Sequence, residues 1–288
     1  MGKISKKLAD RFRQFRQAGQ RLHTQAVRDF AKVPKDVKNV QQLVDSGHDP
    51  LHAAYVAAQN LASFFAESVS TFPEFKPYCK IVGPAEDNYL PNAPPHSPLT
   101  RSYFTTWAFF DVQFGPDKET IGTCLLDIAD LVGLDSFTVE TIRNFQKTRM
   151  GVYENCGLEG SRVHLRELVT NEEFTCHIAT GYTGEKGELW YVRLCPPLCS
   201  LVDYHVAVTT PYILTDASKA DWTAYLSKSV MGVTDPKKAL HRFLKYGKKL
   251  NDWNEFVFLA YHHHQFEAIF LAGLPDVKGS LPHAELSR

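Results

Sequence analysis

The largest group of potential metal ligands in the sequence is a run of three histidines near the C-terminus. The segment is Tyr261-His262-His263-His264-Gln265-Phe266-Glu267. On a helix, His263 and Glu267 would share a face because they are four residues apart. Imidazole and carboxylate groups bind zinc and similar divalent metals, and His264 is a further metal candidate. The alternative is that these histidines are hydrogen-bonded within an apolar contact.

A second pair of histidines is predicted from strand pairing. If Thr170-Asn171 forms a two-residue hairpin turn, His164 lies opposite His177. In this register Arg166 lies on the same side of the hairpin as the two histidines. The other side is apolar and consists of Val163, Leu165, Cys176 and Ile178. Two facing imidazoles could share an anion or a metal, or could be an ordinary exposed pair. His164, His177 and Arg166 are therefore the candidate binding residues.

Further chemistry could come from carboxylates or cysteines. Clustered carboxylates could hold Mg²⁺, and the ones considered are Asp111, Glu119, Asp127 and Asp130. Cys195 and Cys199 are close in sequence, but no second pair at zinc-finger spacing follows them. No P-loop, dinucleotide-binding fingerprint or nucleophile elbow completes a catalytic set, so the sequence leaves open whether the chain is an enzyme.

The composition is that of a globular protein with balanced charge. Hydrophobic residues make up 44% and charged residues 22% of 288 residues, which excludes a disordered chain. Lys plus Arg and Asp plus Glu both number 32, so the chain lacks the basic field of a typical non-specific nucleic-acid binder. No apolar run is long enough to span a membrane. The six cysteines show no disulfide pattern, which favours an intracellular, cytoplasmic protein.

The first 23 residues combine an apolar stripe with seven basic side chains. Ile4, Leu8, Phe12 and Phe15 recur at helical spacing, so an amphipathic helix is predicted. Such a helix could be a basic arm for a membrane or nucleic acid. We favour a helix docked on the rest of the protein, with Phe12 and Phe15 buried.

The remaining pattern predicts helices at both ends and a small β-barrel between them. Asp49-Pro50 begins a helix, and prolines from Pro84 to Pro98 indicate a loop. Five short alternating segments between residues 150 and 210 predict a small antiparallel barrel. Helices then return, and the last is expected to run from Asn251 or Asp252 toward Gly273. The expected regions are 1–83 (helical), 84–101 (Pro-rich connection), 102–214 (helices and barrel) and 215–288 (helical).

Residues 102–197 resemble a unit of uncharacterised bacterial proteins. The matching motifs are Trp107-Ala108-Phe109-Phe110-Asp111, Gly151-Val152-Tyr153-Glu154, Leu165-Arg166-Glu167-Leu168 and the strand from Gly187 to Pro196. The resemblance implies helices leading into a small barrel, and a helical aromatic segment. Those relatives often end in a SEC-C motif, a cysteine-rich zinc module. Here no cysteine follows Cys199, so that module's metal-dependent role does not carry over.

The sequence thus predicts an α+β protein: a helical N-terminal part, a central small antiparallel β-barrel and a helical C-terminal part. We expect a non-enzymatic binding protein that uses the barrel, without a cofactor, and with a protein or nucleic acid as a possible partner. The alternative is a metal-dependent hydrolase, using a divalent metal such as zinc, near His262–Glu267.

Overall fold

A computed structural model describes residues 1–17, 40–91, 96–198 and 202–275, with the side chains of residues 15–17 excepted. The chain divides into two compact units. Unit 1 comprises residues 1–85 and 104–147, and unit 2 comprises residues 86–103 and 148–288. In the described part of the chain, no helix combines the length and apolarity that crossing a membrane requires.

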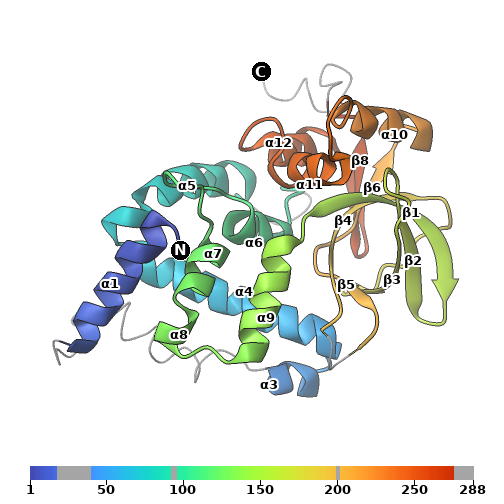
Figure 1. Cartoon of the computed structure of the whole chain (residues 1–288). Helices are drawn as coiled ribbons and strands as arrows, with labels where there is room; N and C mark the ends of the chain where they lie inside the picture. The colour runs from blue at the N-terminus through green and yellow to red at the C-terminus, as the bar shows by residue number, and fades with distance from the viewer. Residues whose placement is uncertain (18–39, 92–95, 199–201, 276–288) are drawn as a thin grey trace. The chain divides into compact units, whose positions relative to one another are not determined.

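Unit 1 is helical (Figure 1). Its elements are α1 (Lys3–Gln17), α3 (Val40–Asp45), α4 (Pro50–Val69), the 3₁₀ turn η1 (Pro73–Phe75), most of α5 (Lys76–Tyr89) and of α6 (Arg101–Phe110), α7 (Ile121–Asp127), α8 (Ala129–Val132) and α9 (Ser136–Lys147). The predicted start of α4 is confirmed, because the Asp49 side chain accepts hydrogen bonds from the backbone N–H groups of Leu51 and His52. In the core, the rings of Phe110 and Phe145 stack with centroids 4.4 Å apart.

The docked N-terminal helix is confirmed for the described residues. Ile4, Leu8 and Ala9 of α1 are buried, and the Arg11 guanidinium lies 3.0 Å from the Glu74 carboxylate. Phe12 is only half-buried, which corrects the expectation of full burial. The Phe15 side chain and residues 18–23 lie outside the described part of the chain.

Unit 2 is built on a closed five-stranded barrel (Figure 1). Its strands are β1 (Met150–Glu159), β2 (Arg162–Glu167), β3 (Glu173–Ile178), β4 (Leu189–Cys195) and β5 (His205–Ala207). They follow the order β1-β2-β3-β5-β4, and pairing of β1 with β4 closes the circle. The predicted barrel is thereby confirmed. One pairing differs from the antiparallel expectation, since β3 and β5 run parallel.

Strand β1 closes the barrel by pairing with two neighbours. Its first half, from Met150 to Glu154, pairs with β4, and its second half, from Tyr153 to Glu159, pairs with β2. The register shifts between Asn155 and Gly157, which marks a β-bulge. A bulge bends and twists a strand, so it lets one strand serve both sides of a small barrel.

The sheet continues beyond the barrel through three more strands. β6 (Tyr212–Thr215) pairs with β4, β8 (Ala268–Ala272) pairs parallel to β6, and β7 (Tyr261–Gln265) forms the end of the strand order. Helices α10 (Lys219–Lys228), α11 (Pro236–Tyr246) and α12 (Asp252–Leu259) lie between β6 and β7 in the chain. The α+β class is confirmed, with β-structure returning inside the C-terminal part.

Two local predictions need correction. Helix α5 continues through Pro84 to Tyr89, so the proline-rich loop starts later than expected. Buried Tyr78, Ala85 and Tyr89 recur at spacings of seven and four, and burial of this face outweighs the backbone hydrogen bond that Pro84 cannot make. The helix expected from Asn251 to Gly273 ends at Leu259, and a β-hairpin follows.

Candidate functional site

The outer surface of β2 and β3 gathers the candidate binding residues of the barrel. We call this surface the β2–β3 face, and its members are Arg162, His164 and Arg166 of β2 with Thr175 and His177 of β3. The alternate residues Val163, Leu165, Cys176 and Ile178 are buried in the barrel core. The predicted inward and outward alternation is therefore confirmed, and His164, Arg166 and His177 share the outer side.

The predicted pairing of His164 with His177 is wrong. His164 lies opposite Thr175, while His177 pairs with Val206 of β5. The cause is the turn, because Glu167 and Glu172 close a four-residue loop in place of a two-residue turn. Asn171 ends this loop with a positive φ of 57°, a conformation that Asn tolerates better than most residues. The register moves by two residues, so no side chain changes face.

An ion-pair network occupies one end of the β2–β3 face. The Arg166 guanidinium lies 3.0 Å from the Glu154 carboxylate of β1, and the Lys219 ammonium lies 2.7 Å from the same carboxylate. The hydrogen bond from Lys219, with Arg166 beside it, holds the pKa of the Glu154 carboxyl below its ordinary value. Glu154 thus fixes the orientation of the Arg166 side chain. The sequence pattern did not predict this partner.

This network predicts a specific loss of stability in acid. The depressed pKa of Glu154 means that its stabilising effect is full above the ordinary carboxyl pKa and is lost as pH falls through the folded-state value. Between about pH 5 and about pH 3, the free energy of unfolding should therefore fall more in the wild type than in Glu154→Gln. Urea unfolding at both pH values measures the difference. Glu159→Gln, which changes an 83% exposed carboxylate, is the matched control; equal falls in wild type and Glu154→Gln would contradict the prediction.

The middle and opposite end of the face carry a histidine and a stacked arginine. Nε2 of His164 lies 3.0 Å from the Glu159 carboxylate, and its Nδ1 lies 3.4 Å from the Thr175 hydroxyl. The Arg162 guanidinium lies over the Tyr204 ring, 3.6 Å from its centroid. Tyr204 immediately precedes β5. The face therefore offers hydrogen-bonding groups beside an aromatic and guanidinium stack.

The three adjacent histidines lie on a strand, which corrects the helical expectation. His262, His263 and His264 belong to β7 and are exposed. The His263 ring stacks on Phe270 of β8 with centroids 4.4 Å apart, and Nδ1 of His264 lies 3.4 Å from the Tyr261 hydroxyl. Partial desolvation and the neighbouring imidazoles lower the pKa of His263.

The predicted combination of His263 with Glu267 loses its geometric basis. Gln265 pairs with Ala268, so Phe266 and Glu267 form the turn of the β7–β8 hairpin. The two candidate ligands therefore do not share a helix face. Throughout the described residues, no three or more His, Cys, Asp or Glu side chains are grouped so that they could hold a metal ion.

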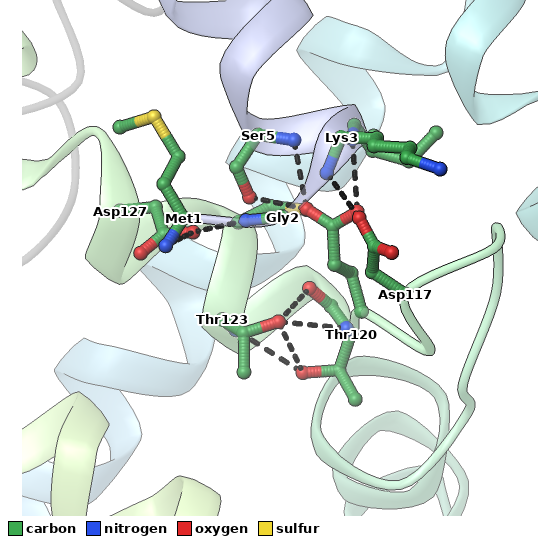
Figure 2. A network of polar contacts seen from close by, with 11 residues as sticks. Met1, Gly2, Lys3, Ser5, Asp117, Thr120, Thr123 and Asp127 are labelled. Atoms are coloured by element: carbon green, nitrogen blue, oxygen red, sulfur yellow. Dashed lines mark hydrogen bonds and ion pairs between the residues drawn. The ribbon is translucent and has the colours of Figure 1, made fainter.

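Two of the four candidate magnesium carboxylates, Glu119 and Asp127, instead anchor helix α1 (Figure 2). The Glu119 carboxylate accepts hydrogen bonds from the backbone N–H groups of Ile4 and Ser5, both at 2.8 Å, and from the Ser5 hydroxyl at 2.5 Å. Asp127 accepts a bond from the Gly2 N–H at 3.3 Å. Asp130 is exposed. Because free N–H groups at a helix start favour negative charge, Glu119 and Asp127 have a structural role here.

Cys195 of the candidate cysteine pair is fully buried in β4. Burial raises the pKa of its thiol to about 12, which opposes the thiolate form that binds metals. Cys199 lies outside the described residues.

Several residues of the β2–β3 face and of its ion-pair network were not predicted from the sequence. Tyr204, Glu154 and Lys219 come from three separate segments. Glu154 lies directly opposite Arg166 in the β1–β2 pair, while Tyr204 and Lys219 reach the face from distant parts of the sequence. The alternation of side chains along β1 could have predicted that Glu154 points outward. No comparable local signal marks Lys219, which reaches the face from α10.

No protein-family model, curated protein or solved structure matches this chain. The resemblance of residues 102–197 to a unit of bacterial proteins that often end in a SEC-C motif therefore stays a prediction.

Proposed function

We propose that this chain is a non-enzymatic binding protein that holds its ligand on the β2–β3 face. The observation that carries the proposal is the strand order β1-β2-β3-β5-β4, closed through β1 and β4, with β3 parallel to β5. This is the arrangement of OB-type Greek-key barrels, which bind ligands on the face of strands 2 and 3 and on the loops after strands 1 and 4. Fold analogy gives only the location, so the ligand class must come from the residues.

The residues at this location favour a ligand that is recognised by stacking and hydrogen bonds. Tyr204 belongs to the segment between β4 and β5 and carries the Arg162 guanidinium on its ring. Next to this stack, His164 presents an imidazole that is a third exposed. Aromatic rings, imidazoles and guanidinium planes are the groups on which unpaired nucleobases stack.

The β2–β3 face carries charged side chains of both signs. Among the described residues, three cations of the face and its surroundings are accompanied by three carboxylates: Arg162, Arg166 and Lys219 with Glu154, Glu159 and Glu173. A face of this kind binds with a weak dependence on salt, unlike a lysine-rich groove. We therefore infer that the ligand is a short single-stranded nucleic acid, held mainly through its bases.

The test is binding of a fluorescently labelled single-stranded oligonucleotide, measured by anisotropy. Loss of one base stack costs about 1–3 kcal/mol, so Tyr204→Ala should weaken binding by roughly five-fold or more. Phe266→Ala removes an exposed aromatic ring from the β7–β8 turn and is the matched control. Equal affinity of Tyr204→Ala and the wild type would overturn the assignment to this face. Binding of a peptide panel, with no oligonucleotide binding, would overturn the ligand class.

We further propose that the protein acts in the cytoplasm. The support comes from its cysteines, because the five in the described residues are all free thiols. Thiols are kept reduced in the cytosol, whereas exported proteins commonly form disulfides.

A further inference from the structure

Strand β7 carries an irregularity at the histidine run. The register of the β7–β8 pair moves from Tyr261–Leu271 directly to His263–Phe270, so His262 is the extra residue of a bulge. In a regular strand, successive side chains point to opposite faces. A bulge can instead bring two successive side chains to the same side.

The two imidazoles beside the bulge are close together. Nδ1 of His262 and Nδ1 of His263 are hydrogen-bonded at 3.2 Å, and the ring planes cross at 84°. One of the two nitrogens carries the shared proton, and a metal ion bound by both would take the place of that proton. The His263 ring lies flat on Phe270, with 4° between the planes, so its position is fixed by the sheet. One half of the pair is thus preorganised.

The separation of the two nitrogens suits a shared metal ion. Zinc–imidazole bonds are about 2.0–2.1 Å long, so two nitrogens 3.2 Å apart subtend about 100–106° at a common ion. That angle lies between the square-planar and tetrahedral values that copper and zinc sites adopt. Both rings are exposed, so an ion can reach them from solvent and keep water in its other positions.

We propose that His262 and His263 form a two-imidazole site for a divalent transition metal ion such as Zn²⁺. The site is independent of the β2–β3 face and of the proposed function. It also differs from the site suggested by the sequence, because it uses a bulged strand and does not include Glu267. His264 lies outside the pair, with its Nδ1 beside the Tyr261 hydroxyl.

The experiment is calorimetric titration of Zn²⁺ into the full chain, purified without a histidine tag and treated with a chelator. One ion should bind per chain. Loss of an outer-shell partner already weakens metal binding by about 10–100-fold, so His262→Ala and His263→Ala should each weaken it by at least about tenfold.

His264→Ala is the matched control, because it removes an adjacent exposed histidine that is not part of the pair. It should bind Zn²⁺ as the wild type does. All three substitutions are at exposed positions, and circular dichroism spectra check that each variant is folded. No binding by the wild type, or equal loss in His264→Ala, would overturn the proposal.

Discussion

Replacing Glu119 with alanine is expected to destabilise unit 1 by about 3 kcal/mol. Hydrogen bonds to a charged partner contribute about 1.5–3 kcal/mol each, and the contributions overlap when one carboxylate makes several. Glu119 accepts bonds from two backbone N–H groups at the start of α1 and from the Ser5 hydroxyl. Its removal leaves buried Ser5 and the Ile4 amide without that acceptor. Urea unfolding measures the loss, and hydrogen exchange at the Ile4 and Ser5 amides should accelerate.

Asp117→Ala provides the control for this prediction. Asp117 accepts one hydrogen bond at 2.7 Å from the backbone N–H of Lys3, at an exposed site. An exposed helix cap contributes about 0.5–2 kcal/mol, with typical values near 1. If Glu119→Ala costs no more than Asp117→Ala, the buried carboxylate does not anchor the helix.

Gly2 lets the start of α1 lie close to the Glu119 carboxyl group. A Cβ atom at Gly2 would overlap the Glu119 carboxyl group. A larger residue at this position would require the Glu119 side chain to shift out of its hydrogen bonds, and no unusual φ is involved. The sequence suggested Mg²⁺ for the group of Asp111, Glu119, Asp127 and Asp130, because the amide donors of α1 that Glu119 and Asp127 meet are distant in sequence.

Local periodicity predicted the barrel strands well, and their partners less well. Alternation along β2 and β3 placed Leu165 and Cys176 inside and His164 outside, because side-chain direction depends only on the strand itself. Register depends on the turn, and Thr170-Asn171 was too short a choice for the loop that forms. The parallel pairing of β3 with β5 joins segments that no local pattern connects.

The prediction that the histidine run lies on a helix was wrong for a different physical reason. Apolar residues from Trp253 onward fit a helix and a buried strand equally well over short lengths. Helix α12 does begin as expected, but Phe266-Glu267 forms a hairpin turn that contains neither Gly nor Asn, and Phe266 has a φ of 49°. Without a recognisable turn residue, the sequence gives no sign that the helix has ended.

The alternation in β2 can be tested directly with two adjacent substitutions. Leu165 is 1% exposed and belongs to the barrel core with Trp190 and Tyr153, so Leu165→Ala should lower the free energy of unfolding by about 2–5 kcal/mol. His164→Ala changes the next residue, whose ring lies on the outer face, and should cost no more than about 0.5 kcal/mol. Chemical denaturation, followed by circular dichroism, compares the two variants. Similar costs would mean that β2 does not place one face in the core, and the β2–β3 face would then lose its structural basis.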